Sequence, residues 1–323
     1  MVSNAVIGID LGGTKVSGAL FDWESMVSSR EILMLGDRTG KAVGALVMEV
    51  INNLIQWGEE FKVNVTGVGI AVPGIYHRKT GTVWAPNITG WEDYPLYSDL
   101  SGELNRKGID VWIDSDRACC IMGEAWEGAA KGCKDAIFLA VGTGIGAGIM
   151  ADGKVLRGSH DIAGATGWMS LTDPWIDGYR NCGCFEYHAS GYGIAERAKD
   201  LLKNKQVAFA GAGGKSLEQV TAADVFEAYN RGDPDAKEII AHCNEFWGKA
   251  CANLVSLFNP EKIIFGGGVF GPAVQFIDDI YEEAAKWAQP VSIRSVKFER
   301  SALGQDAALY GAAFLALNNG RNL

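Results

Sequence analysis

The sequence contains no apolar run that approaches the roughly 18 residues of a membrane span, so no membrane partner is expected. Residues 1–4 carry no basic charge and lead into no signal core, so export is not expected, and they leave no room for an N-terminal DNA-binding module. An excess of positive charge is missing too, and the formal net charge of −10 argues against a nucleic-acid-binding surface. The seven cysteines show no framework spacing, which predicts reduced thiols in a cytoplasmic protein.

The chain is long enough, at 323 residues, for two domains with separate cores. A content of 48% hydrophobic and 21% charged residues is typical of a soluble globular protein. Strands and helices alternate along the chain, with strands expected over 65–72 and 111–113 and a helix over 40–61. This alternation predicts an α/β fold.

Two strand–turn–strand units mark the two halves of the chain. The first turn contains Gly12, Gly13, Thr14 and Lys15 between strands over 6–10 and 16–22. The second contains Gly142, Thr143 and Gly144, and follows a buried strand over 137–141. Backbone N–H groups in such turns can bind an anion, although glycine also serves bulges and close packing. Their repetition predicts a duplicated two-domain architecture that holds a phosphate group between its halves.

Asp10 lies at the end of the first strand, directly before the first glycine turn. A carboxylate beside a phosphate-binding turn is suited to hold Mg²⁺ through water molecules. Alternatively, Asp10 only forms a hydrogen bond within its own turn. The second glycine turn favours the nucleotide interpretation.

Asp116 is the candidate general base. It lies where a buried strand ends and a helix begins, at Ser115 or Asp116, and such positions face ligands in α/β proteins. Phosphoryl transfer to a hydroxyl needs a carboxylate within reach of the attacking oxygen. The alternative is that Ser115 or Asp116 only caps the helix, because both residue types are favoured there.

Three further features lie in the second half of the chain. Gly266, Gly267 and Gly268 follow a strand over 262–265 and could hold an adenosine, or could form only a tight turn. Cys182 and Cys184 with His188 could form part of a metal or redox site, although a solvated helix histidine is favoured for His188. Helices are expected over 185–203 and, with an amphipathic pattern, over 305–317, and a glycine-rich loop over 208–215.

Taken together, these segments resemble the ROK family of sugar kinases, and the resemblance covers nearly the whole chain. It implies a two-domain actin-like ATPase (ribonuclease H-like) fold, with nucleotide and sugar bound in the interdomain cleft. The domains would comprise residues 1–117 plus 305–323 and residues 118–304. The motifs behind the resemblance are Asp10-Leu11-Gly12-Gly13-Thr14-Lys15, Val72-Pro73-Gly74, Ala85-Pro86-Asn87, Ser115-Asp116, Gly142-Thr143-Gly144, Gly183-Cys184-Phe185-Glu186, Gly266-Gly267-Gly268 and Leu303-Gly304-Gln305-Asp306-Ala307.

By this resemblance, Asp116 takes the proton from the sugar hydroxyl that attacks the γ-phosphate of ATP. The glycine turns with Thr14 and Thr143 correspond to the family's phosphate-binding turns. Gly74, Asn87 and Glu186 correspond to positions around the sugar. The resemblance also implies ATP and Mg²⁺ as cofactors and a homodimer.

The chain departs from the family pattern around the acceptor. Ser115 stands where the family usually has Asn, and Ala165 and Trp168 stand where it has the Glu and His of its Gly-Glu-x-Gly-His stretch. Asp177 and Tyr179 occupy the positions of two zinc-binding cysteines, so a structural zinc of the family type is predicted to be absent. Trp168 either offers an apolar face to the substrate or only fills the space left by the changed loop.

These departures predict an ATP-dependent kinase for a sugar or sugar-like polyol, and poor binding of plain glucose, because the lost groups would pair with its hydroxyls. The alternative is a catalytically weak sensor that binds a sugar or nucleotide. A transcriptional repressor of the same family is disfavoured by the acidic charge and the expected absence of a DNA-binding module.

Overall fold

A computed structural model of the protein describes residues 3–23, 26–205 and 216–321. The chain divides into two compact units. The first comprises Met1–Gly132, Gly148–Ala163 and Asp306–Leu323, and the second comprises Cys133–Ala147 and Gly164–Gln305. The loop expected over 208–215 lies outside the described residues.

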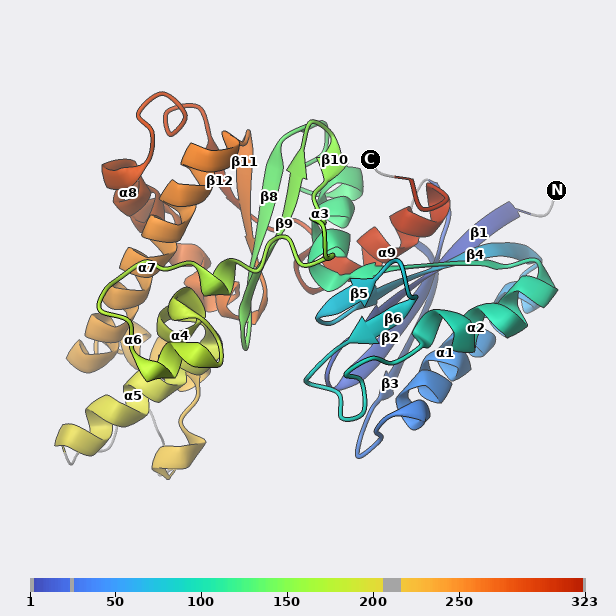
Figure 1. The fold of residues 1–323 in the computed structure, drawn as a ribbon, viewed down its shortest axis with the longest axis horizontal. Helices are drawn as coiled ribbons and strands as arrows, with labels where there is room; N and C mark the ends of the chain where they lie inside the picture. The colour runs from blue at the N-terminus through green and yellow to red at the C-terminus, as the bar shows by residue number, and fades with distance from the viewer. Residues whose placement is uncertain (1–2, 24–25, 206–215, 322–323) are drawn as a thin grey trace. The chain divides into compact units, whose positions relative to one another are not determined.

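A five-stranded sheet in the order β3-β2-β1-β4-β7 forms the centre of the first unit (Figure 1). Strands β1, β2 and β3 pair antiparallel, as the first predicted hairpin requires, whereas β4 runs parallel to β1 and β7 runs parallel to β4. Asp10 pairs with Ala71, and Ala71 pairs with Asp114, so the carboxyl ends of three parallel strands meet at one edge. The strands are β1 Ser3–Leu11, β2 Lys15–Phe21, β3 Met26–Met34, β4 Val63–Val72 and β7 Asp110–Ser115.

Helices cover both faces of this sheet. Helices α1 (Lys41–Glu60) and α2 (Leu96–Leu104) pack on one face, where apolar residues of α1 such as Val47 and Ile51 are fully buried. Helix α9 (Ala307–Leu317) covers the other face, and α3 (Asp116–Glu127) packs against α9 (Figure 1). The smaller elements of this unit are β5 Ile75–His77, β6 Thr82–Trp84 and the 3₁₀ turn Asn105–Lys107.

Helix α9 is buried on nearly all sides, so the amphipathic helix predicted for this segment is wrong in character. It lies between the sheet and α3, and both contacts are close. A side chain at Gly69 of β4 would collide with the carbonyl oxygen of Ala312, and one at Gly311 would collide with that of Cys119 in α3. These contacts also place α3 in the first unit, whereas the sequence prediction put residues 118–132 in the second domain.

A second five-stranded sheet has the order β10-β9-β8-β11-β12. Strands β8, β11 and β12 are parallel, and β9 and β10 are antiparallel. The unit boundary falls within β9. The strands are β8 Ala136–Val141, β9 Ile145–Ala151, β10 Lys154–Val155, β11 Lys262–Gly266 and β12 Lys297–Arg300.

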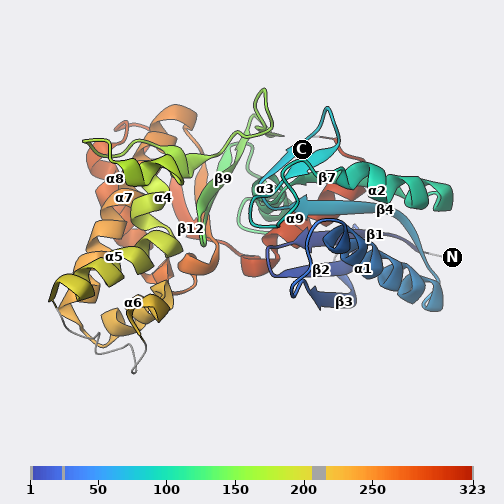
Figure 2. The same cartoon turned by 60° about the horizontal axis from the view of Figure 1, so that its bottom comes forward.

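Helices of the second unit pack beside these strands, with α7 against α8 and α6 against both α5 and α7 (Figure 2). The segment predicted as one helix over 185–203 forms two, because the backbone of Ser190 is extended and its hydroxyl accepts a hydrogen bond from the Gly193 N–H. The helices are α4 Cys184–Ala189, α5 Gly191–Lys205, α6 Ala222–Asn230, α7 Pro234–Phe258 and α8 Ile277–Trp287. The 3₁₀ turns are Thr166–Trp168, Asp177–Arg180, Leu217–Gln219, Gly268–Phe270, Pro272–Phe276 and Gly304–Asp306. None of the helices in the described ranges combines the length and the apolar character of a bilayer-spanning segment.

Candidate active site

The first glycine turn joins β1 to β2 and exposes Gly13 and Thr14. Its ends are fixed by hydrogen bonds from the Gly12 N–H to the Lys15 carbonyl oxygen, at 2.9 Å, and from the Leu35 N–H to the Thr14 carbonyl oxygen, at 2.8 Å. A side chain at Gly13 would lie 2.9 Å from Nδ2 of Asn87. The structure therefore brings a predicted sugar-binding residue against the predicted phosphate-binding turn.

Asp10 is the second-to-last residue of β1, directly before Leu11 and these glycines. Burial, and to a smaller extent nearby Asp116, raise the pKa of its carboxyl to about 7 against the opposite effect of Lys15 and Arg30. The pKa effect of Asp116 shows that the two carboxyl groups are electrostatic neighbours. Two buried carboxylates that repel one another provide a favourable place for a cation.

Asp116 is the first residue of α3. The helix cap is Ser115, whose hydroxyl accepts a hydrogen bond from the Ala118 N–H at 3.3 Å. Oδ1 of Asp116 accepts a local hydrogen bond from the Arg117 N–H at 2.7 Å. Burial raises the pKa of Asp116, and Arg117 opposes this rise. Of the two capping residues that the sequence offered, Ser115 is the helix cap, and Asp116 is the first helical residue.

Gly74 follows β4 at the same edge of the sheet. Its φ of +83° suits glycine, and a side chain there would collide with the carbonyl oxygen of Trp84. Its own carbonyl oxygen accepts a hydrogen bond from Nη2 of Arg117 at 3.1 Å. All the first-unit residues predicted for the site therefore lie at or near the carboxyl ends of β1, β4 and β7, or against the turn that follows β1.

The second glycine turn, Gly142–Gly144, joins β8 to β9. The Gly142 carbonyl oxygen accepts a hydrogen bond from the Gly191 N–H at 2.8 Å, and the Thr143 carbonyl oxygen accepts one from the Tyr192 N–H at 3.3 Å. The break between α4 and α5 thus lets the first residues of α5 bind this turn. Space around Gly142 is open, since a side chain there would meet no atom within 4 Å.

A cavity of about 530 Å³ begins at the second turn and connects it with the predicted adenosine segment at Gly268. Its walls include four residues that sequence reasoning missed. Three lie on one face of α5, namely Tyr192, Ala195 and Lys199, and Phe226 lies on α6. The helical spacing of the α5 residues was the available signal, but it does not distinguish a ligand-facing side from a packed one.

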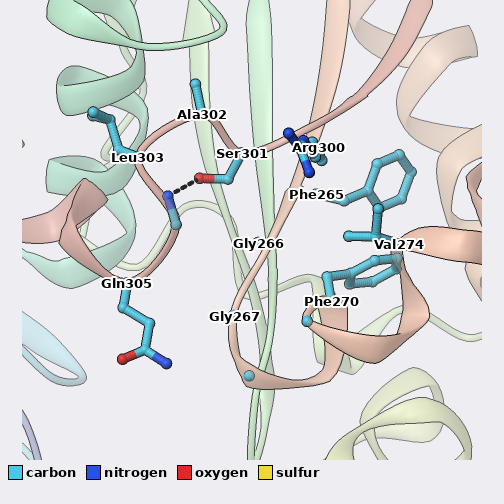
Figure 3. A pocket seen from close by; sticks show the side chains of 13 residues that line it. Phe265, Gly266, Gly267, Phe270, Val274, Arg300, Ser301, Ala302, Leu303 and Gln305 are labelled. Carbon is cyan, nitrogen blue, oxygen red and sulfur yellow. Dashed lines mark hydrogen bonds between the residues drawn. The ribbon is translucent and has the colours of Figure 1, made fainter.

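A second cavity, of about 600 Å³, lies at the other side of the Gly266–Gly268 segment. Figure 3 shows Phe270 and Val274 on one side of it and the segment from Ser301 to Gln305 on the other. The Ser301 hydroxyl accepts a hydrogen bond from the Gly304 N–H at 2.7 Å, which holds that segment in a turn. Gly268 lines both cavities, and only the first of them also contains residues of the second glycine turn.

Glu186 of α4 lies beside the second turn. Its Oε2 accepts a hydrogen bond from the Ile145 N–H at 2.6 Å, and the glycines at 144 and 167 leave the room that its carboxylate occupies. Burial raises the pKa of Glu186, and the hydrogen bond from Ile145 lowers it. Trp168, directly after Gly167, is 58% exposed, so it does not fill an interior space among the described residues.

A hydrogen-bonded chain of aromatic side chains begins at Tyr179, in the segment where the family's zinc motif would fall, and continues into α4 and α7. The hydroxyl of buried Tyr179 lies 2.7 Å from Nε2 of His188, and Nδ1 of His188 lies 3.1 Å from Nε2 of His242 in α7. His188 is therefore half-buried between partners, and the prediction of a solvated histidine is wrong. Asp177 points outward and pairs with Arg180. The described residues contain no cluster of three or more His, Cys, Asp or Glu arranged for a metal ion, and the absence of zinc stays a prediction.

Comparison with known proteins gives consistent matches over nearly the whole chain. The model of the ROK family matches residues 6–319. Glucokinase of Halalkalibacterium halodurans is 29% identical over 313 residues, covering 96% of this chain and 94% of that protein. The xylose repressor of Caldicellulosiruptor bescii is 28% identical over 319 residues, covering 98% of this chain and 78% of the repressor. A crystal structure of a ROK family glucokinase from Streptomyces griseus with glucose and AMPPNP has a TM-score of 0.79 and 28% identity, covering 97% of this chain and 99% of that one.

Proposed function

The chain belongs to the ROK family, and from this membership we propose that it transfers the γ-phosphoryl group of ATP to a hydroxyl of a sugar or sugar-like polyol other than plain glucose. The fold prediction is confirmed, since the chain has the two-domain actin-like ATPase fold of its structural relatives. The prediction that ligands bind in an interdomain cleft remains part of this proposal.

The observation that carries the proposal is the placement of Asp116. Its carboxyl lies at the carboxyl end of a parallel strand, is released from helix capping by Ser115, and neighbours Asp10. A base at that position would accept the proton of the attacking hydroxyl as the oxygen–phosphorus bond forms. Burial raises the pKa of Asp116, which makes its carboxylate a better proton acceptor near neutral pH.

ATP would be held by both glycine turns and by the cavity of the second unit. We assign the adenosine to the cavity lined by Gly142, Thr143 and Gly268, because it alone of the two cavities beside Gly268 also reaches a phosphate-binding turn. Tyr192 and Phe226 supply apolar walls for the base, and Lys199 supplies a cation at its edge. The other turn, with Thr14 and Lys15, would hold the terminal phosphates through backbone N–H groups and the Lys15 ammonium.

Asp10 fits a Mg²⁺ ion that arrives with ATP. Mg²⁺ is commonly bound by one or two carboxylates together with water and substrate phosphates, so a full cage of protein ligands is not needed. Such an ion neutralises charge on the phosphates when it is bound. The raised pKa of Asp10, caused by burial and by Asp116, supports this assignment, because a positive charge there would stabilise the ionised carboxylate.

The acceptor is where this chain differs from its family. Ala165 and Trp168 replace two side chains that would pair with sugar hydroxyls, while Glu186 remains fixed beside Gly144. A site that lacks those partners loses discrimination in favour of plain glucose. The exposed indole of Trp168 is suited to stack on a ring or to cover an acyl, deoxy or anhydro group.

The same substitutions favour a second candidate, a sensor that binds sugar or nucleotide with little turnover. We further propose that the protein is cytoplasmic and homodimeric, with neither nucleic acid nor membrane as a partner. The net charge of −10 supports the exclusion of nucleic acid.

Coupled ADP-release measurements on hexoses, amino sugars, anhydrosugars and cyclitols test the proposal. We expect turnover of at least one compound, and a fall in kcat of about 10³-fold in Asp116→Asn, because general base catalysis contributes about 10²–10⁴-fold. Asp37→Asn, at an exposed position of the same unit, is the matched control and should retain wild-type kcat. ATP binding without turnover of any compound would instead support the sensor.

A further inference from the structure

A buried ion pair stands next to the candidate base. Arg157, which follows β10, places Nε and Nη2 each 2.7 Å from Oδ2 of Asp114, and both side chains are only 8% exposed. Nη1 of Arg157 donates to the Val155 carbonyl oxygen at 3.1 Å. Both residues belong to the first unit.

The other oxygen of Asp114 acts directly on the strand-to-helix junction. Oδ1 accepts a hydrogen bond from the Ser115 N–H at 2.9 Å. Ser115 in turn caps α3 through its hydroxyl, and Asp116 is the first helical residue. Asp114 thus links the guanidinium of Arg157 to the backbone that determines where the Asp116 carboxylate points.

The segment that carries Arg157 is itself folded back on the first unit. The Arg157 carbonyl oxygen accepts a hydrogen bond from the Ala163 N–H at 3.0 Å. Oδ2 of Asp161 accepts one from the Arg78 N–H at 3.2 Å. These contacts hold the loop that carries Arg157, while the hydrogen bond from Nη1 to the Val155 carbonyl oxygen holds the guanidinium itself.

Stability alone is a poor explanation for such a pair. The cost of removing two charges from water commonly cancels their attraction, so well-packed apolar residues can replace a buried pair without loss of stability. The pair is better explained by the backbone geometry that it imposes. Here it holds the Ser115 backbone at the strand-to-helix junction beside Asp116.

We propose that Arg157 is a positioning residue for Asp116, acting through Asp114 and the Ser115 backbone. This inference rests on the proposed function for its catalytic consequence, while its structural part concerns the junction itself. A base misplaced by about 1 Å can lower catalysis by about 10²-fold. Loss of the pair should therefore lower kcat far more than it changes the KM for ATP or acceptor.

The test is the double variant Asp114→Leu with Arg157→Met, which removes the pair without leaving an unpaired buried charge. We expect a melting temperature close to wild type, a fall in kcat of about 30-fold to 100-fold, and KM values within about threefold. Arg157→Lys, which keeps the charge, should recover part of kcat. The exposed pair of Glu103 and Lys107 gives the matched control, Glu103→Gln with Lys107→Met, which should keep wild-type kcat.

Hydrogen exchange of the amides at Ser115 and Ala118 provides a readout that needs no turnover. Faster exchange there in the Asp114→Leu/Arg157→Met variant, with unchanged melting temperature, supports the inference. Unchanged exchange at these amides, or a folded variant with kcat within twofold of wild type, overturns it. Absence of turnover in the wild type would reject the proposed function, and the exchange measurement would still decide the role of Arg157.

Discussion

The two units hold their candidate site residues in different ways. In the first unit, Asp10 and Asp116 lie at the ends of parallel strands in one register, so sheet geometry sets their positions. In the second unit, Glu186 and Trp168 lie on a short helix and a 3₁₀ turn, which depend on the contacts of a loop. By the family resemblance, the sheet edge keeps Asp10 and Asp116 but has Ser115 in place of Asn. The loop-borne part keeps Glu186, while Ala165 and Trp168 stand in place of the family's Glu and His. We infer that the carboxylates proposed for phosphoryl transfer are kept at positions set by the sheet. Most of the changes around the acceptor lie instead in segments whose positions depend on loop contacts.

The largest effect is expected from removing the Asp10 carboxylate at the sheet edge of the first unit. Asp10→Asn should lower kcat by about 100-fold, because the carboxylate that fits Mg²⁺ is lost. The same change should raise the melting temperature of the ligand-free protein at pH 8. The pKa of Asp10 is raised from 3.8 to about 7 on folding, so its contribution to stability falls as pH rises through that range.

Activity and melting of this variant are measured on one preparation, and wild type in excess EDTA should lose activity in parallel. Full activity in Asp10→Asn would show that phosphoryl transfer does not need the Asp10 carboxylate at the sheet edge.

The next change tests the loop-borne part. Trp168→Ala should raise the KM for the acceptor by about fivefold and leave the KM for ATP unchanged, since an aromatic contact contributes about 0.5–1.5 kcal/mol beyond its area. Steady-state kinetics with the acceptor and ATP varied separately distinguish the two effects. Trp175→Ala, another exposed tryptophan of the same unit, is the control. Equal KM values in Trp168→Ala and wild type would mean that the indole does not contact substrate.

The smallest effect is expected from changing His188 and His242, the hydrogen-bonded pair that contacts Tyr179. Burial first, and Arg197 second, lower the pKa values of His188 and His242 to about 4. Both histidines are therefore neutral in the folded protein, while the unfolded chain binds protons near pH 6.5. Their contribution to stability is complete above pH 6.5 and is lost as pH falls towards 4.

Melting temperatures from pH 7 to 4.5 should thus fall more steeply in wild type than in His188→Asn/His242→Asn. The exposed His160→Asn should behave as wild type. Parallel curves for wild type and the double variant would show that the histidine chain does not depend on neutral imidazoles.

Periodicity and turn chemistry were sufficient to predict much of the fold. The first hairpin, α1 and the start of α3 were expected from alternation, helical spacing and the Ser115-Asp116 pair, and the structure confirms them. These features depend on neighbours in the sequence. The local side-chain pattern is therefore sufficient to predict these three features.

What could not be predicted depends on partners far apart in the chain. Helix α9 is buried by both the sheet and α3, which its own sequence cannot show. His188 meets His242 across 54 residues, and Arg157 meets Asp114 across 43. Each such partner is set by tertiary packing, so a single residue or short motif gives no signal for it.

Acceptor specificity is tested most directly by comparing kcat/KM for glucose with kcat/KM for the best acceptor of the panel, in wild type and in Ala165→Glu/Trp168→His. We expect wild type to prefer the other acceptor, and the double variant to shift preference towards glucose by about 10-fold or more because hydrogen-bonding groups are restored. A wild type that phosphorylates glucose best, or a double variant with unchanged preference, would contradict this expectation.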